Sequence, residues 1–453
     1  MKDTKRRFPP QTIYDRTGIQ RELETQAEKG WYLEKCSALG WVYRKGNPQK
    51  VPYAVTYFPN ADAYDPAPSE ELLRFQEFCA HTGWEPVSSN AQVQIFRNHR
   101  ENPIPIETDP VIEVENIHAS MKKTQYKSWI TGIILAAMNL GLHLWQFSIR
   151  PIEFLATNFY LIVVLMWLIM LANHGVQLLI YRKWLKAARA NAADGVFTDT
   201  KAPSFLHYIP LVLAFLLMVL MLWNMPGVNG KQHALLILLG TTGVIGLSVL
   251  FTWFMKKNGV DADTNRALSV VMTIALAFIL LVVACGVVFT AKPEAAGERY
   301  TVNGYTTYIY QEEIPLKIED LMDSDYENYS YEILDNLSSP LLNYQWCQQT
   351  AMVDAPEEPE MDYTIVDVNA PFLRDWAVEQ MLAKSFRLSA AHSRTCQALD
   401  AAPWGAVEVY QLVIDGQPWD HYLVCYETRI VKLDLSWTPT PEQMAVIGAI
   451  VNK

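Results

Sequence analysis

Five apolar runs dominate the pattern of hydrophobic and polar positions along the chain. Each reaches the roughly 20 residues that a helix needs to cross a hydrocarbon layer of about 30 Å. A buried helix of a soluble protein would keep a polar face, but none of these runs contains Asp, Glu, Lys or Arg. The pattern therefore predicts five transmembrane helices within residues 116–291. They cover about 129–149, 157–181, 205–225, 233–255 and 267–290.

The distribution of charge divides the chain into three parts. Residues 1–127 carry seventeen basic and seventeen acidic side chains, residues 128–291 carry ten and five, and residues 292–453 carry ten and twenty-six. Charged stretches on both sides of an apolar region indicate soluble domains before and after the membrane helices. We therefore expect a first domain over residues 1–115 and a second over residues 292–453.

The acidic excess of the last part has two interpretations. A strongly charged surface is most often a solvated face. The alternative is that its long-range field attracts cations or cationic peptides. In both cases the charge argues against direct binding of anionic polymers.

Basic residues near the ends of the apolar runs predict the orientation. On one side of the membrane the only basic residues in the connections are Arg150 and Lys231. Basic flanks stay in the cytoplasm, so we expect a multi-pass protein of the cell membrane with a cytoplasmic N-terminus and an extracytoplasmic C-terminus. The charged start MKDTKRRFPPQ lacks an apolar core, so the first membrane helix is expected to direct insertion. The cytoplasmic side is marked by Lys122, Lys123, Lys127, Arg182, Lys183, Lys186, Arg189, Lys201, Lys256, Lys257 and Arg266.

The N-terminal part repeats one pattern, in which an amphipathic helix ends at Gly-Trp and strands follow. Residues 17–29 and 70–81 show helical spacing of apolar positions, and Gly30 and Gly83 stand where helices are expected to stop. The two copies predict a small α+β domain with its helices on one face of an antiparallel sheet. The strands are expected from Trp31 and over residues 39–45, 51–59, 84–88 and 91–97.

The tryptophans of this pattern are interpreted as core residues. Trp31, Trp41 and Trp84 begin or lie within expected strands, where large aromatic side chains anchor a core. The alternative is a platform on which nucleotide bases stack, which calls for a surplus of basic residues. Residues 1–127 are neutral overall, so no nucleic-acid partner is expected.

The same residues carry a resemblance to a known family. The segments EKGWYLEK, WVYRKG, PYAVTYFP, FCAHTGWE, QIF and ENPIPIETDP occur in this order over about 100 residues. This outline resembles the domain-of-unknown-function family number 2812. The resemblance implies a bacterial membrane protein in which this domain precedes the membrane helices, and it implies no established activity.

Polar side chains inside the expected membrane helices are candidate functional positions. Asn139 and His143 share a helix face, and Asn173, His174 and Gln177 gather in the second helix. Such residues can line a path for a ligand or metal, or they can form hydrogen bonds between helices. At 1.5 Å per residue the two histidines differ in depth by roughly 14 Å, which is too far for one metal ion. No expected span contains an acidic residue, so coupled transport lacks its usual carboxylate.

The C-terminal part reads as a second α+β domain. A helix is expected over residues 370–385, and Asp415-Gly416 has the composition of a tight hairpin turn. Thr440, Pro441 and Gln443 resemble a capping box that opens a closing helix over residues 441–452. The remaining expectations are a strand over 300–310, a loop or short helix over 313–321, and a meander over 404–412, 421–426 and 429–437.

No residue set in this part predicts a chemistry. His392 and Cys396 lie at i, i+4, but no CxxC or HExxH completes a metal site. No nucleophile, phosphate-binding or cofactor motif is present either, so neither a metal nor a cofactor is expected. The part contains an odd number of cysteines, which permits at most one disulfide with a free thiol, or three buried reduced side chains. They are Cys347, Cys396 and Cys425.

Two functions from different classes are compatible with this organisation. The preferred hypothesis is a non-enzymatic membrane signalling or accessory protein that links an outer domain to a cytoplasmic one. The alternative is a permease-like component of a transport system. Besides the bilayer, a second copy or another membrane or cytoplasmic protein is the expected partner. Gly240, Gly243 and Gly246 provide a small-residue face for close helix packing.

Overall fold

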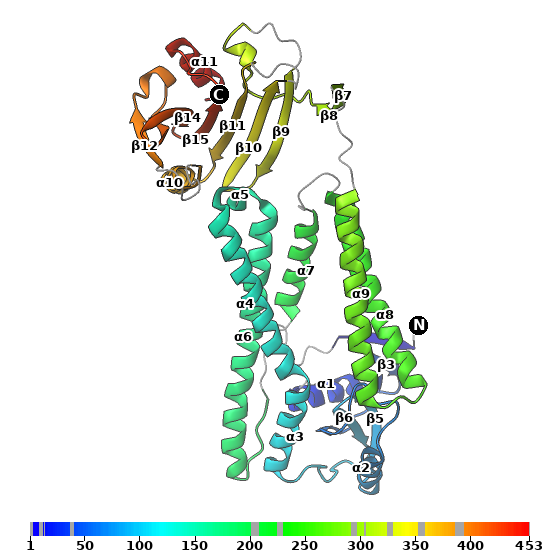
Figure 1. The fold of residues 1–453 in the computed structure, drawn as a ribbon. Helices are drawn as coiled ribbons and strands as arrows, with labels where there is room; N and C mark the ends of the chain where they lie inside the picture. The colour runs from blue at the N-terminus through cyan, green and yellow to red at the C-terminus, as the bar shows by residue number, and fades with distance from the viewer. Residues whose placement is uncertain are drawn as a thin grey trace. The chain divides into compact units, whose positions relative to one another are not determined.

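The computed structural model describes most of the chain (Figure 1). The described residues form two compact units, which are treated separately below. The first comprises Met1–Leu140, Leu165–Trp223 and Lys231–Val287, and the second comprises Gly141–Val164, Asn224–Gly230 and Val288–Lys453. The described residues are 3–8, 12, 14–36, 40–200, 208–223, 230–290, 297–302, 305–323, 329–351, 358–385 and 394–452.

The first unit begins with two copies of a strand–helix–strand–strand element. In each copy the strand before the helix pairs with the last strand, which gives two antiparallel sheets of order β1-β3-β2 and β4-β6-β5. The strand predicted over residues 51–59 therefore opens the second copy, and strand β1 was not predicted. The elements are β1 (Thr4–Arg7), α1 (Arg16–Glu28), β2 (Trp31–Lys35), β3 (Trp41–Lys45), β4 (Tyr53–Tyr57), α2 (Glu70–His81), β5 (Trp84–Asn90) and β6 (Val93–Asn98).

The two copies share the same backbone details after each helix. Gly30 and Gly83 adopt positive φ angles of 77° and 89°, a conformation that glycine reaches without a Cβ clash. The N–H of Gly30 donates to the Ala27 carbonyl and that of Gly83 to the Ala80 carbonyl, each at 2.9 Å. A register shift follows in each hairpin, between Leu33 and Lys35 and between Pro86 and Ser88. Both bulges thus begin two residues after the tryptophan.

A third helix, α3 (Pro110–Lys123), extends this unit beyond the predicted boundary at residue 115. Asp109 caps its start and accepts a hydrogen bond of 2.8 Å from the Val111 N–H, with Pro110 in the first turn. Val114, Ile117 and Met121 join the core formed by the two sheets and α1. The ENPIPIETDP segment therefore leads into a helix that belongs to the first unit.

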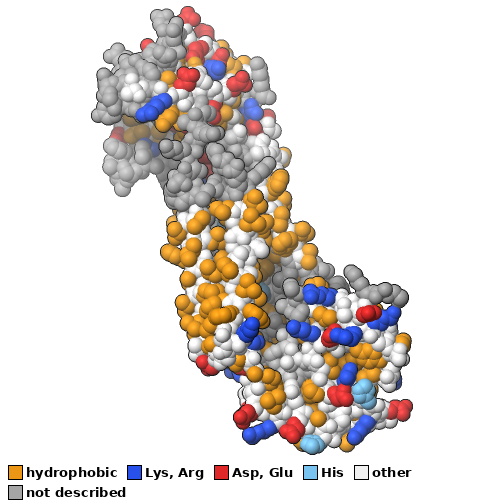
Figure 2. Space-filling view, turned by 90° about the vertical axis from the view of Figure 1, so that its right-hand side faces the viewer, with side chains coloured by type: hydrophobic (Ala, Val, Ile, Leu, Met, Phe, Trp, Pro, Cys, Tyr) orange, Lys and Arg blue, Asp and Glu red, His pale blue; other side chains and the backbone are white. Residues whose placement is uncertain are grey.

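Long apolar helices follow α3. Among the described residues, four helices are long and apolar enough to cross a membrane, namely Gln125–Ile149, Asn158–Ala193, Leu235–Lys257 and Ala262–Leu280. No more than 11% of the most apolar stretch of each is buried, and Figure 2 shows hydrophobic side chains gathered over the middle part of the face that it draws. The molecule is therefore a membrane protein by length and composition of its helices. The elements are α4 (Gln125–Ile149), α6 (Asn158–Ala193), α7 (Tyr208–Trp223), α8 (Gly230–Lys257) and α9 (Ala262–Thr290).

The fifth span stays a prediction. It was expected over residues 205–225, where α7 has 16 described residues, Tyr208–Trp223. The flanking residues 201–207 and 224–229 lie outside the part of the chain that the structure describes. The polypeptide thus contains an apolar helix at the expected position.

The core of the first unit continues into the last turns of α6. Tyr181, Leu185, Ala188 and Ala192 are buried in the same cluster as the two sheets, and so is Trp129 of α4. The Tyr181 ring lies 5.2 Å from that of Tyr14, and its hydroxyl lies 2.9 Å from His118 Nδ1 on α3. These contacts make the start of α4 and the last turns of α6 part of the core of the first unit.

The turn between α8 and α9 also holds the loop after β4. Lys256 Nζ donates to the Ala63 carbonyl at 2.9 Å, and Asn265 Nδ2 donates to the Tyr64 carbonyl at 3.2 Å. Asn265 is fully buried, and Arg266 forms an ion pair with Asp62. A buried amide with a backbone partner fixes the loop in one position.

The second unit is built on one antiparallel sheet of seven strands in the order β12-β13-β14-β15-β11-β10-β9. Helix α11 (Pro441–Val451) covers one face, where Ile447 packs with Tyr363 and Trp404. Helices α5 (Pro151–Ala156) and α10 (Arg374–Ser385) cover part of the other. The strands of this sheet are β9 (Tyr329–Ser338), β10 (Leu342–Ala351), β11 (Met361–Val368), β12 (Arg394–Leu399), β13 (Glu408–Ile414), β14 (Gln417–Cys425) and β15 (Arg429–Leu435). Strands β7 (Glu298–Val302) and β8 (Tyr305–Ile309) form a separate hairpin, and the short helices are Ile318–Asp320, Pro371–Leu373 and Ala402–Trp404.

Several local expectations for this unit agree with the structure. Asp415 and Gly416 form the turn between β13 and β14 with φ angles of 50° and 80°. Thr440 and Gln443 form the expected capping box at the start of α11. Strands β9, β10 and β11 were not predicted, and they form almost half of the sheet.

Helix α5, the connection between α4 and α6, belongs to the core of this unit. Its Ile152 and Ala156 are 5% and 0% exposed, and they pack in one cluster with Leu342 and Val366 of the sheet. Figure 1 shows α5 at the ends of β9 and β10. The link between α4 and α6 is thereby part of the core of the second unit.

Candidate functional site

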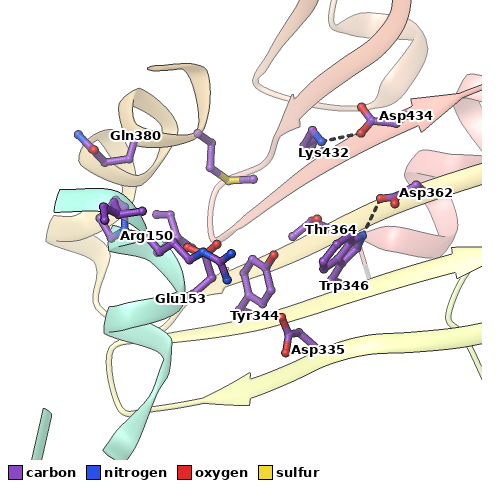
Figure 3. Close-up of a pocket in the computed structure, with 14 residues that line it drawn as sticks. Arg150, Glu153, Asp335, Tyr344, Trp346, Asp362, Thr364, Gln380, Lys432 and Asp434 are labelled. Atoms are coloured by element: carbon purple, nitrogen blue, oxygen red, sulfur yellow. Dashed lines mark hydrogen bonds and ion pairs between the residues drawn. The ribbon is translucent and has the colours of Figure 1, made fainter. Parts of the chain in front are cut away.

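A cavity of about 400 Å³ lies on the sheet face that α5 and α10 leave partly uncovered (Figure 3). The strands contribute aromatic and acidic side chains, while α5 and α10 contribute the opposite wall. Its polar and aromatic lining residues are Arg150, Glu153, Asp335, Tyr344, Trp346, Asp362, Thr364, Gln380, Lys432 and Asp434.

The pleat of the sheet explains why these side chains meet. Alternate residues of a strand point to the same face, so residues that pair across strands form rows. One row runs from Asp335 through Trp346 and Thr364 to Lys432. The next row holds Asp362, opposite Asp434, which in turn lies opposite His421.

The carboxylate of Asp434 is paired with two basic side chains. His421 Nδ1 and Lys432 Nζ lie 2.6 Å and 2.5 Å from its two carboxylate oxygens. Burial raises its pKa, but the hydrogen bond from His421 and the charge of Lys432 outweigh burial and hold the pKa below its usual value. Asp434 is therefore charged at neutral pH.

Asp362 lies in a different environment, although it faces Asp434 across the two strands. It accepts a hydrogen bond of 2.8 Å from Trp346 Nε1 (Figure 3). Burial, together with the negative charge of Asp434, raises the pKa of Asp362. Like charges directly opposite each other on neighbouring strands are unfavourable, and the charges of Lys432 and His421 offset part of this repulsion.

Helix α5 supplies Glu153 in its first turn, next to the phenol of Tyr344. Burial raises the pKa of Tyr344, and the negative charge of Glu153 adds to this effect. Among the described residues, neither Glu153 nor Asp335 has an ion-pair partner. These two carboxylates are therefore available to a bound cation.

A second cavity of about 550 Å³ adjoins the first at the ends of α4 and α6. The Gln146 amide donates a hydrogen bond of 2.6 Å to the Tyr160 hydroxyl inside it. The two cavities share Ile149, Arg150, Glu153 and Asp335. The other residues that line the second cavity are Leu142, Trp145, Phe154, Thr157 and Leu337.

The family assignment rests on the first unit, whose repeated element and exit helix α3 are described above. Residues 17–129 match the family described as protein of unknown function DUF2812. This confirms the resemblance drawn from the Gly-Trp segments. No curated protein and no solved structure matches the chain.

The three tryptophans of the DUF2812 domain differ in their surroundings. Trp41 and Trp84 are buried, at 7% and 3% exposed, and Trp84 Nε1 donates a hydrogen bond of 2.8 Å to the Ile104 carbonyl. Trp31 is half-buried at the margin of the main core, with Lys5 Nζ 4.4 Å from its ring centre.

The polar residues singled out in the membrane helices do not lie in either cavity. Asn139 Nδ2 donates to the Leu135 carbonyl of its own helix at 2.9 Å. The His143 ring lies edge-on to Phe154 and Tyr160, 6.4 Å from each. Asn173 and Gln177 are buried, and the imidazole of His174 occupies the space beside Gly132. Among the described residues no group of three His, Cys, Asp or Glu side chains is arranged to hold a metal ion.

Every cysteine whose side chain the structure describes is free. Cys347 and Cys425 are buried in the second unit, whereas Cys396 is exposed on β12. Cys36 and Cys79 are buried in the DUF2812 domain. Burial raises the pKa of each of these four buried thiols, so they are unreactive core side chains. His392, the other member of the i, i+4 pair, lies outside the described residues.

Sequence reasoning missed most of the cavity because it missed β9, β10 and β11. The segment MDYTIVDV begins with a regular alternation, in which buried Met361, Tyr363 and Ile365 flank Asp362 and Thr364. This alternation was the available signal for a strand with one polar face. Arg150 was considered only as a charge beside the membrane, although it lies where both cavities meet.

Proposed function

We propose that this chain is a non-enzymatic membrane signalling or accessory protein, in which the state of the outer cavity alters the DUF2812 domain. One observation carries the proposal. The two helices that are joined by α5, at the wall of the cavity, have their other ends in the core of the DUF2812 domain, through Trp129 of α4 and Tyr181 of α6.

Continuous helices provide the mechanical connection. Helices α4 and α6 span 25 and 36 residues without a described break, and packed cores shift between discrete arrangements rather than deform gradually. A ligand that moves α5 against the sheet would therefore displace both helices along their length. The proposal assigns binding, not catalysis, to the cavity.

The proposed orientation follows from the basic residues described above. With the DUF2812 domain in the cytoplasm and five helices, residues 292–453 face the outside of the cell. The ligand would then come from outside or from the outer leaflet, and the partner that receives the signal would be a cytoplasmic protein, a membrane protein or a second copy of the chain.

A permease-like role is the second candidate, and a different observation favours it. Hydroxyl groups link α8 and α9, with Thr252 and Ser269 3.0 Å apart and Thr273 donating to Ser248 at 2.9 Å. A cavity of about 860 Å³ opens beside this ladder. A polar seam of this kind can guide a solute, or it can simply hold two helices together.

Hydrogen exchange of the full-length protein in nanodiscs tests the preferred function. The variant Ser339→Ala removes the hydrogen bond by which the sheet holds the Leu155 carbonyl of α5. We expect faster exchange in α5 and also in α3, where His118 meets Tyr181. The matched control is Ser338→Ala, whose exposed hydroxyl bonds only Asn343. A change confined to α5 and the neighbouring strands contradicts the proposal.

A further inference from the structure

The two adjoining cavities of the second unit differ in the polarity of the side chains that line them. The cavity on the sheet face is lined by four carboxylates and two basic side chains, with Tyr344 and Trp346 between them. The other lies at the ends of two candidate membrane spans, and most of its lining is apolar or aromatic. The two cavities are continuous, because the same four residues line both of them. These residues are Ile149, Arg150, Glu153 and Asp335.

The apolar cavity is open to the lipid-facing side of its helices. Leu142 and Trp145 line it and are 57% and 66% exposed. Large apolar side chains exposed at the end of a membrane-spanning helix lie against acyl chains, and Trp and Tyr mark the boundary with water. An aliphatic chain in the bilayer therefore reaches this cavity without crossing water.

The polar cavity selects for positive charge. Asp434 has its own partners in His421 and Lys432, but Glu153 and Asp335 have none among the described residues. Both of these carboxylates lie in the shared part of the lining together with one basic side chain, Arg150, so acidic groups outnumber basic ones there. Aromatic rings beside them add attraction for an ammonium group. An anionic head group would meet more carboxylates than basic side chains.

We propose that the joined cavities bind an amphiphile with an amine-bearing head group, its ammonium between Glu153 and Asp335 and its aliphatic chain in the cavity lined by Leu142, Trp145 and Phe154. The inference rests on the proposed function in one respect, because such a molecule would be the signal that the outer unit detects. Binding itself requires only the two cavities.

The alternatives fit less of the lining. A small amine without a chain leaves the apolar cavity empty, and a fatty alcohol leaves Glu153 and Asp335 unneutralised. A metal ion would need a cluster of ligands, and the described residues contain no group of three suitable side chains. Only a molecule that is both cationic and aliphatic uses both cavities.

Equilibrium binding of radiolabelled dodecylamine to the full-length protein in dodecyl maltoside tests the inference. Butylamine, dodecanol and dodecyl sulfate are the comparison probes. We expect saturable binding of dodecylamine near one per chain, and at least tenfold weaker binding of each comparison probe. Binding of dodecanol or dodecyl sulfate as tight as that of dodecylamine overturns the assignment of the head group, and equal binding of butylamine overturns that of the chain.

Paired variants locate the site. Glu153→Gln with Asp335→Asn should weaken dodecylamine binding at least tenfold, and Asp335→Asn alone provides a milder change on the edge strand β9. The matched control, Glu427→Gln with Asp375→Asn, removes the same number of carboxylates from exposed positions of the same unit. Equal affinity in the site variants and the control contradicts the inference.

The same samples separate this inference from the proposed function. If dodecylamine binds as stated while exchange in α3 stays unchanged at saturation, the ligand class holds and the signalling role fails. If Ser339→Ala alters exchange in α3 while dodecylamine does not bind saturably, the signalling role holds and the ligand class fails.

Discussion

Ser339 Oγ donates a hydrogen bond of 2.6 Å to the Leu155 carbonyl. The hydroxyl belongs to the turn between β9 and β10, and the carbonyl belongs to α5, which joins two membrane helices. Ser339 is 5% exposed and also accepts hydrogen bonds from the N–H groups of Leu341 and Leu342, both at 3.1 Å. One side chain thus fixes a hairpin turn of the seven-stranded sheet and helix α5, which joins α4 to α6.

Replacing this serine should destabilise the second unit. Ser339→Ala leaves the buried N–H of Leu342 without its side-chain acceptor, so we expect a cost of about 1–3 kcal/mol and a lower melting temperature of the full-length protein. Circular dichroism in detergent measures the melting temperature of each variant. Ser338→Ala should change the melting temperature little, because its hydrogen bond is exposed. Equal melting temperatures for the two variants would show that the contact is not structural.

The two equivalent tryptophans of the DUF2812 repeats should respond differently to truncation. Trp84 is buried with Phe96 and Cys79, so Trp84→Ala should cost about 3–5 kcal/mol. Trp31 is half-buried, so Trp31→Ala should cost about half as much. Thermal unfolding of the full-length protein compares them. An unchanged melting temperature in Trp84→Ala would rule out its role as a core anchor.

A buried acidic pair predicts how the stability of the DUF2812 domain depends on pH. Glu113 is 2% exposed and forms an ion pair of 3.2 Å with Arg16, while Glu107 donates a hydrogen bond to Glu113 and accepts one from the Tyr57 N–H. Burial raises the pKa of both carboxyls, and the charge of Glu113 raises that of Glu107 further.

The folded state therefore binds a proton more tightly than the unfolded state. The free energy of unfolding should therefore increase as the pH falls from above neutral toward the ordinary pKa of a glutamate. It should decrease as the pH rises through the raised pKa of the folded state. Glu107→Gln supplies a neutral group in the same place, so it should stabilise the protein at pH 8 by about 1 kcal/mol and flatten this slope. Melting temperatures at pH 6 and pH 8 measure both effects. A steeper slope in the variant contradicts the assignment of the proton to Glu107.

The native cysteines provide a test of orientation. Cys396 is exposed on β12, whereas Cys36, Cys79 and Cys347 are buried. If residues 292–453 face outward, a membrane-impermeant maleimide should label the wild-type protein in intact cells and should not label Cys396→Ala. In that background, an added His81→Cys on the exposed side of α2 should react only after permeabilisation. The reverse pattern would invert the proposed topology.

Local patterns predicted the helices and their ends well, because those depend on nearby residues. Thr440 and the two Gly-Trp steps act within one turn of the chain, and the structure contains each as a cap or helix stop. Helix α3 and its cap Asp109 were not predicted. The apolar runs predicted the membrane helices for the same reason, since crossing a bilayer requires only length and composition.

The cavity depends on pairings that no local pattern contains. Asp362 and Asp434 are 72 positions apart, and they meet only because β11 pairs with β15. Arg150 and Glu153 precede the second unit in sequence and reach it only through the packing of Ile152 on the sheet. A site assembled in this way has no signature in the spacing of residues along the chain.

A double-mutant cycle tests the central claim, which is that the outer end of the helix pair is coupled to the core of the DUF2812 domain. Ser339→Ala removes the outer contact, and Tyr181→Phe removes the hydroxyl that lies 2.9 Å from His118 Nδ1. The opening free energy of the amides of α3 is measured by hydrogen exchange for the wild type, both single variants and the double variant. Independent distant sites add within about 0.3–0.5 kcal/mol. The account predicts an interaction energy above about 0.5 kcal/mol, and additive effects in α3 would contradict it.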